Sequence, residues 1–127
     1  MIHNLRLNPA PFAMIAQGIK TIELRLYDEK RQLINVDDEI IFTNTEDGAK
    51  QIRAKVLALH KFSSFEELYA NLPLLKCGYT DADIHTASPK DMEEYYSRDK
   101  QKKYGVVGIE IEEMNILKVR HYVKLES

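Results

Sequence analysis

The sequence contains very little cysteine, since Cys77 is the only one among 127 residues. A lone cysteine excludes a disulfide within the chain, and no His or Asp stands beside it to make it a nucleophile or a metal ligand. The chain also lacks an N-terminal apolar stretch and any long apolar run, which argues against an export signal and a membrane-spanning helix. We therefore expect a cytoplasmic protein with a buried or inert thiol.

An excess of positive charge is missing as well. Lysine and arginine total 18 against 20 acidic residues, and this net charge of −2 argues against avid nonspecific binding to polyanions. Residues 1–35 are locally cationic, with five basic side chains and three acidic ones. The histidines are too scattered for a metal cluster, so we expect no metal and no cofactor. They are His3, which we expect to be a hydrogen-bonded strand residue, His60, His85 and His121.

What is present is the pattern of a folded chain, with 44% hydrophobic and 30% charged residues and a length that suits one domain, 1–127. Alternating apolar residues predict strands near residues 3–7, 20–27, 39–43, 51–62 and 104–111, with a closing strand at 116–127. Cap, proline and glycine signals predict helices at 11–18, 65–72 and 89–97. The order of elements is typical of a barrel or curled sheet, not of a parallel βαβ fold.

Residues 20–31, KTIELRLYDEKR, combine the alternating apolar pattern of a strand with charged and polar side chains that can bind a ligand or take part in catalysis. Ile22, Leu24 and Leu26 alternate and define one buried face. The opposite face then carries Thr21, Glu23, Arg25 and Tyr27, with Lys20 just before it. One interpretation is an edge strand with a solvated, ion-paired polar face. The other is the floor of a cleft.

Several segments together carry a family resemblance. They are HNLRL at 3–7, PF at 11–12, GIKTIELR at 18–25, DEIIF at 38–42, YYS at 95–97 and YGVVGIEI at 104–111. In these segments the chain resembles the ASCH family, small domains of the PUA-like superfamily. The resemblance implies an α+β fold, a mostly antiparallel PUA-like β-barrel with two or three flanking helices. It also implies a cleft in which the strand at 20–25 faces RNA or a nucleotide.

The chemistry of these side chains is consistent with binding. Arg25 carries a planar guanidinium whose paired N–H donors suit a phosphate or a base edge, and Lys20 carries a compact positive charge. Glu23 can accept a hydrogen bond from an exocyclic amine or hold Arg25 in place. Tyrosines offer stacking surfaces if they line the same cleft. We predict an RNA- or nucleotide-binding protein whose ligand-contacting residues are Lys20, Thr21, Glu23, Arg25, Tyr96, Ser97 and Tyr104.

A small hydrolase acting on a modified nucleoside is the alternative function. The resemblance extends to amidohydrolases that deacetylate N4-acetylcytidine, whose lysine matches Lys20 while Glu23 stands where they have a threonine. In an enzyme, Glu23 would be the general base and Lys20 would stabilise an oxyanion. Proximity of Lys20 lowers the pKa of Glu23 and weakens it as a base, which favours binding. A protein-interaction module without a ligand is the third hypothesis.

Two further segments of the sequence are rich in basic residues. Residues 98–103 are expected to form a solvated charged face, and the alternative is a lid over RNA. Lys118, Arg120 and Lys124 alternate along the predicted closing strand. They are expected to be solvated, with an electrostatic track for RNA as the alternative.

Overall fold

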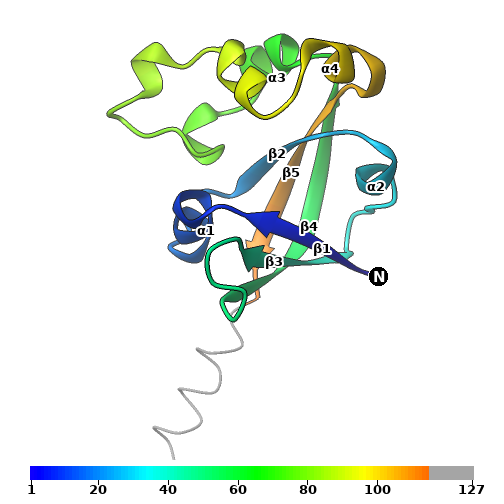
Figure 1. Cartoon of the computed structure of the whole chain (residues 1–127), viewed down its shortest axis with the longest axis vertical. Helices are drawn as coiled ribbons and strands as arrows, with labels where there is room; N and C mark the ends of the chain where they lie inside the picture. Colours follow the sequence, from blue (N-terminus) through cyan, green and yellow to red (C-terminus); the bar gives the residue numbers. More distant parts are fainter. Residues whose placement is uncertain (115–127) are drawn as a thin grey trace, which may run out of the picture.

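The structure, a computed structural model, describes residues 1–114 (Figure 1). Its five strands form one sheet in the order β1-β3-β4-β5-β2. Only β1 and β3 pair in parallel, and the other three pairs are antiparallel. The strands are β1 (Ile2–Leu7), β2 (Ile22–Leu26), β3 (Glu39–Asn44), β4 (Gln51–Phe62) and β5 (Val106–Glu113). The predicted closing strand, with Lys118, Arg120 and Lys124, lies outside the described residues.

Short helices connect these strands, and most of them gather at one end of the sheet (Figure 1). The segment from residue 65 to residue 104, which we call the helical cap, begins where the Ser64 side chain accepts a hydrogen bond from the Glu67 amide. The α-helices are α1 (Pro9–Ala16), α2 (Glu29–Gln32), α3 (Phe65–Asn71) and α4 (Arg98–Tyr104), and the 3₁₀ helices are η1 (Leu74–Lys76), η2 (Ile84–Thr86) and η3 (Pro89–Glu94). The predicted α+β fold is confirmed.

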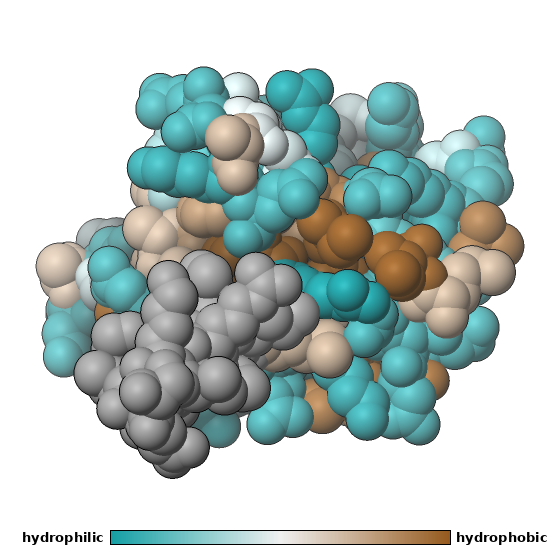
Figure 2. Space-filling view, turned by 90° about the horizontal axis from the view of Figure 1, so that it is seen from below, coloured by the Kyte–Doolittle hydropathy of each residue, from teal (hydrophilic) through white to brown (hydrophobic). Residues whose placement is uncertain are grey.

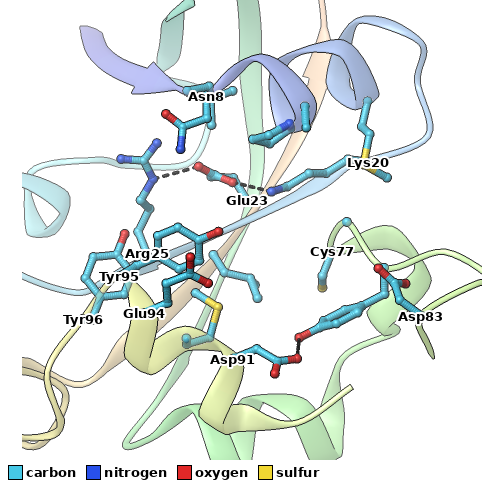
Figure 3. Close-up of a pocket in the computed structure, with 18 of the residues that line it drawn as sticks. Asn8, Lys20, Glu23, Arg25, Cys77, Asp83, Asp91, Glu94, Tyr95 and Tyr96 are labelled. Atoms are coloured by element: carbon cyan, nitrogen blue, oxygen red, sulfur yellow. Dashed lines mark hydrogen bonds and ion pairs between the residues drawn. The ribbon is translucent and has the colours of Figure 1, made fainter. Parts of the chain in front are cut away.

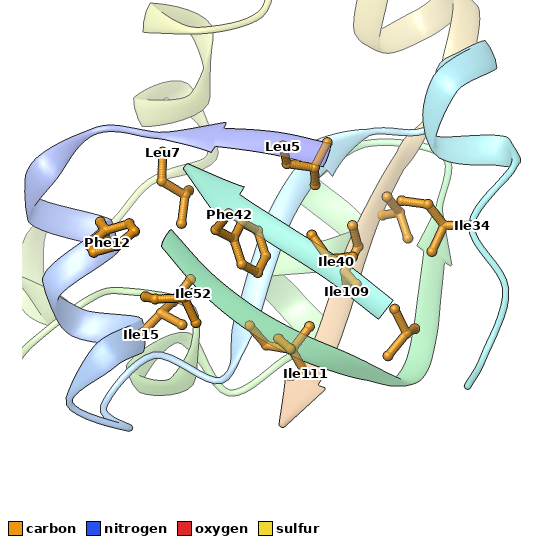
Figure 4. Close-up of a cluster of buried hydrophobic side chains, with 13 residues drawn as sticks. Leu5, Leu7, Phe12, Ile15, Ile34, Ile40, Phe42, Ile52, Ile109 and Ile111 are labelled. Atoms are coloured by element: carbon orange, nitrogen blue, oxygen red, sulfur yellow. The ribbon is translucent and has the colours of Figure 1, made fainter. Parts of the chain in front are cut away.

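Two hydrophobic clusters hold the fold together. The first fills the inside of the curled sheet, where β1, β3, β4 and β5 contribute alternate residues such as Leu5, Ile40, Phe42 and Ile109 (Figure 4). The second lies between the sheet and the helical cap, and it includes Ile22, Leu24, Leu26, Phe65 and Leu68. The cap therefore covers the outer face of β2, and the other face of β2 points into the interior of the curled sheet.

Burial of β2 on both faces decides between the two interpretations of its polar residues. Glu23 is 4% exposed and Lys20 is 9% exposed, and the Arg25 side chain is 12% exposed. The interpretation of a solvated edge strand is wrong. The polar face is enclosed because the cap and the β1–α1 junction lie on either side of it.

Gly108 allows the cap to approach the sheet closely. A Cβ atom at this position would lie 2.6 Å from Leu72 Cδ1 and 3.1 Å from Ile22 Cγ2. A Cβ atom at these distances would force Leu72 and Ile22 to move, so the absence of a side chain at Gly108 favours the close packing of α3 and its C-terminal flank on β5 and β2.

Other local predictions meet mixed outcomes. The long strand predicted at 51–62 is β4, and its ladder with β5 has a register shift between Val56 and Ala58. Residues 98–103, expected as an exposed charged segment, lie in helix α4, which Ser97 caps by accepting from the Lys100 amide. The helix predicted at 89–97 is the shorter 3₁₀ helix η3.

The surface carries some apolar side chains. Figure 2 shows a band of hydrophobic residues between hydrophilic regions on one face. Exposed apolar side chains are ordinary in folded domains, so we assign this band no function. Within residues 1–114, no helix combines the length and the apolar composition needed to cross a membrane.

Candidate functional site

The candidate site lies where the two edge strands of the sheet face each other. β1 and β2 share no hydrogen-bonded ladder, because they occupy opposite ends of the strand order. Arg25 crosses this gap, and its Nη2 donates to the carbonyl oxygen of Arg6 over 2.6 Å. We call this gap the β1–β2 seam. Beside it opens a cleft of about 550 Å³ (Figure 3).

Three parts of the chain enclose the cleft. β2 supplies Glu23 and Arg25 to the floor, and Lys20, two residues before the strand, completes it. The β1–α1 junction forms one wall, and the helical cap forms the other. The wall residues include Arg6, Asn8, Pro11 and Met14 from the junction, and Tyr69, Cys77, Gly78, Tyr79, Asp83, Asp91, Met92, Glu94, Tyr95 and Tyr96 from the cap.

Lys20, Glu23 and Arg25 form a buried ion triplet on the floor. Lys20 Nζ lies 2.7 Å from Glu23 Oε1, and Arg25 Nε donates to Glu23 Oε2 over 2.8 Å. Each carboxylate oxygen therefore has its own cationic partner. The strand geometry explains the second contact, because residues 23 and 25 project to the same face of β2.

Electrostatics keep the Glu23 carboxylate ionised. Burial alone would raise the pKa of Glu23, but the charges and hydrogen bonds of Lys20 and Arg25 outweigh burial and lower it below its ordinary value of 4.5. For Arg25, burial is the largest single influence and opposes the charged form, but the charge and hydrogen bond of Glu23, together with Tyr96 and Asp28, outweigh burial and raise the pKa of Arg25. The triplet thus carries two positive charges and one negative charge at neutral pH.

The loop after η1 holds Lys20 in place. Gly78 has φ of +112°, and a Cβ atom there would lie 3.4 Å from Lys20 Cδ. The bare backbone of Gly78 thus lies directly against the lysine side chain. Next to it Cys77 is buried, and burial raises the pKa of its thiol to about 11. The cleft therefore presents a neutral thiol at neutral pH.

The cap wall is aromatic and internally hydrogen-bonded. The Tyr79 hydroxyl donates to Asp91 Oδ2 over 2.6 Å and lies 2.7 Å from the Tyr69 hydroxyl. Burial raises the pKa of both tyrosines, and the bond to Asp91 raises that of Tyr79 further. On the other side, Tyr96 stacks on Phe65, and Tyr95 is 62% exposed. These contacts hold the wall in place, and the exposed ring of Tyr95 lies at its rim.

The structure brings together four of the seven predicted ligand-contacting residues: Lys20, Glu23, Arg25 and Tyr96 line the cleft. The other three do not line it. Thr21 borders a separate hollow of about 390 Å³, and its amide donates to the Lys76 carbonyl. Ser97 caps α4, and Tyr104 packs against the cluster beneath the cap with Lys103 over its ring.

Sequence reasoning missed much of the cap wall. Tyr79 lies in a segment without a clear period and Asp91 lies in the predicted helix at 89–97, and the two residues meet only through the folding of the cap. Gly78 was the one signal available, since a glycine often marks a positive φ or a close approach. His3 is not in the cleft, and its Nε2 lies 2.8 Å from Asp38 Oδ2 at the other end of β1, as a hydrogen-bonded strand residue.

Metal ligation is not evident in this part of the chain. Among residues 1–114, no group of three or more His, Cys, Asp or Glu side chains is arranged to hold a metal ion. Two of the acidic residues of the cleft are engaged with protein partners: Glu23 with two cations, and Asp91 with Tyr79 and the Ser88 amide.

Comparison with known proteins identifies relatives of the whole fold. The family model of the ASCH domain matches residues 5–115. The crystal structure of the hypothetical protein PH0355 has a TM-score of 0.75 and 34% identity, and the match covers 90% of this chain and 100% of that one. The solution structure of protein PF0455 from Pyrococcus furiosus has a TM-score of 0.69 and 30% identity, with 91% and 99% covered.

A more distant solved structure shares the fold. ASCH from Zymomonas mobilis has a TM-score of 0.61 at 14% identity, and the match covers 93% of this chain and 76% of that one. A search among curated proteins found no match.

Proposed function

Because the chain belongs to the ASCH domain family, which is generally regarded as RNA-binding, we propose that the cleft beside the β1–β2 seam binds RNA or a nucleotide-like ligand. The observation that carries this proposal is the buried Lys20–Glu23–Arg25 triplet on the cleft floor. Buried charges are costly and are retained where they are paired and used, so an enclosed triplet facing a cleft supports a recognition site.

The triplet offers both donors and acceptors in fixed positions. Glu23 receives one cation on each oxygen, and each carboxylate oxygen has a further lone pair for a ligand amine. Arg25 uses Nε and Nη2 for protein contacts, and Lys20 retains further N–H groups beyond its bond to Glu23. Donors and acceptors side by side match the edge of a nucleobase.

The size and walls of the cleft fit the same class of ligand. A volume of about 550 Å³ lies within the range of small-molecule sites. The exposed ring of Tyr95 stands at the rim beside Tyr96, where it can stack on a base. A base that enters the cleft thus meets an aromatic wall and a polar floor.

The same geometry weakens the case for hydrolysis. A general base works best with a pKa near the operating pH, whereas the pKa of Glu23 is held below its ordinary value. Both carboxylate oxygens are already bonded to cations. Recognition is therefore favoured over the amidohydrolase alternative.

Calorimetric titration tests the proposal. The four nucleosides, their 5′-monophosphates and an unstructured eight-nucleotide RNA are titrated into wild type and Arg25→Lys, which keeps the charge but loses the planar fork. We expect binding by at least one of these ligands and roughly a tenfold loss in the variant. Arg53→Lys is the matched control, because Arg53 pairs with Glu39 on β3, away from the cleft. Equal affinity of wild type and Arg25→Lys, or no binding, would refute the proposal.

The hydrolase alternative has its own assay. N4-acetylcytidine is incubated with the protein, and release of cytidine is followed by chromatography. Turnover that Glu23→Gln abolishes would replace the binding proposal with hydrolysis.

A further inference from the structure

The charge inside the cleft differs from the charge just outside it. The cleft is lined by three basic residues and four acidic ones: Arg6, Lys20 and Arg25 against Glu23, Asp83, Asp91 and Glu94. Such a lining does not attract a phosphate strongly. Helix α4 next to it carries four basic residues and one acidic residue, namely Arg98, Lys100, Lys102 and Lys103 against Asp99.

Helix α4 adjoins the cleft directly. Gln101 Nε2 donates to the carbonyl oxygen of Tyr96, which is a wall residue. At its C-terminal end, the Gly105 carbonyl accepts from the Tyr27 amide, one residue past the end of β2. The helix therefore extends from the cap wall to the end of the strand that forms the floor.

Lys61 lies at the same end of the sheet. Lys61 and Arg25 both pair with Val107, on opposite sides of β5, so the three residues form one row across the sheet and project to the same face. Two strand spacings separate Lys61 from Arg25, which places their Cα atoms roughly 10 Å apart. The Lys61 ammonium lies 4.9 Å from the centre of the Tyr27 ring.

We call Lys61, Lys102 and Lys103 the basic ridge. All three are exposed, and the Lys103 ammonium lies 5.0 Å from the centre of the Tyr104 ring. Contact with an aromatic ring positions an ammonium group without neutralising its charge, so Lys61 and Lys103 remain available to bind an anion. None of the three forms an ion pair within the described residues 1–114, whereas Arg98 pairs with Glu93.

We propose that the ligand is a single strand of nucleic acid, with one unstacked base in the cleft and the adjoining phosphates on the basic ridge. This inference rests on the proposed function of the cleft and specifies the ligand further. A single strand fits because its bases can leave the stack and its backbone can follow a basic surface. The polar, nearly neutral cleft then reads the base, and the ridge supplies the electrostatic part of affinity.

Fluorescence anisotropy with labelled eight-nucleotide RNA and DNA strands tests this division of roles. The ridge variant Lys61→Gln/Lys103→Gln is compared with Lys50→Gln/Lys55→Gln, which removes the same charge just before β4 and in the first half of that strand. Loss of two phosphate contacts should lower affinity roughly tenfold in 50 mM salt and reduce the slope of log K against log salt by about 1.4. The control variant should match wild type. The affinities for RNA and DNA show which sugar the protein prefers, and weaker binding of either strand to the ridge variant supports the inference.

Small ligands separate this inference from the proposed function. If a nucleoside binds wild type and the ridge variant equally while the strand binds the ridge variant more weakly, the inference holds. If nucleosides or nucleotides bind but the strand binds the ridge and control variants with equal affinity, the inference fails and the cleft proposal survives. The same conclusion follows if the strand binds no more tightly than a mononucleotide. If none of these ligands binds, both fail. Ridge-dependent binding to phosphatidylglycerol vesicles without strand binding also overturns the inference.

Discussion

Arg25 joins the two edge strands of the sheet by donating its Nη2 hydrogen to the carbonyl oxygen of Arg6, 2.6 Å away. The same guanidinium holds Glu23 through Nε. One side chain thus spans the β1–β2 seam and anchors the buried triplet. Because no ladder connects β1 to β2, this contact replaces strand pairing at that position. Structure and candidate function therefore depend on the same residue.

Replacing Arg25 with methionine should destabilise the fold. The substitution keeps an apolar stem but leaves Glu23 with Lys20 as its only cation and removes the bond across the seam. We expect the free energy of unfolding to fall by about 3–5 kcal/mol, as for breaking a buried ion pair. Urea denaturation at pH 7 measures it. Arg53→Met, at a half-exposed pair with Glu39, should cost about 1 kcal/mol or less, and a similar cost for both variants would contradict the prediction.

Stability should also fall in acid through Glu23. The folded-state pKa of Glu23 lies below its ordinary value of 4.5, so the unfolded chain takes up the proton first as pH decreases. The stabilisation by this carboxylate is therefore complete above about pH 5 and is lost progressively below that pH. Glu23→Gln should be less stable than wild type at pH 7, and the difference should shrink towards pH 3.

Urea titrations between pH 7 and pH 3 measure this difference. The exposed Glu46→Gln is the matched control and should follow the wild-type curve. A constant gap between wild type and Glu23→Gln over the whole range would show that the charge of Glu23 is not responsible.

The strands could be predicted from sequence because their signals are local. Ile22, Leu24 and Leu26 alternate, and the structure places all three beneath the cap as one buried face. Alternation cannot tell what covers the opposite face. Glu23 is enclosed by the β1–α1 junction and the cap, and these two parts of the structure come from distant parts of the sequence. The family resemblance, not the alternation, indicated a cleft there.

The cap wall could not be predicted for a different reason. Short 3₁₀ helices have no strong sequence period, and η1, η2 and η3 make up much of the segment between α3 and α4. The contact between Tyr79 and Asp91 joins the turn after η1 to η3. Ser97 and Tyr104, expected to contact a ligand, instead cap α4 and fill the cluster beneath it. Residue chemistry suggested their roles, but only the path of the chain decides which way each side chain points.

Gly78→Ala should loosen the floor of the cleft. Its φ of +112° is strained for any residue with a side chain, and relief of this strain would shift the loop that contacts Lys20. We expect a loss of about 1–3 kcal/mol in unfolding free energy, together with weaker binding of whichever ligand the titrations identify. Gly48→Ala is the matched control, because it has no atom within 4 Å and no positive φ. Unchanged stability and binding in Gly78→Ala would show that Lys20 is not held by this loop.

The Cys77 thiol should react slowly in the folded protein. Burial raises its pKa from 9.0 to about 11, so at pH 8 the folded chain holds roughly a hundredth of the thiolate present in the unfolded chain. Burial also hinders access, so labelling by Ellman's reagent should be at least a hundredfold slower without urea than in 8 M urea. A Lys20→Met variant sharpens the test, because Lys20 lowers the pKa of Cys77 and its removal should slow labelling further. Faster labelling of Lys20→Met would mean that the lysine shields the thiol sterically more than it stabilises the thiolate.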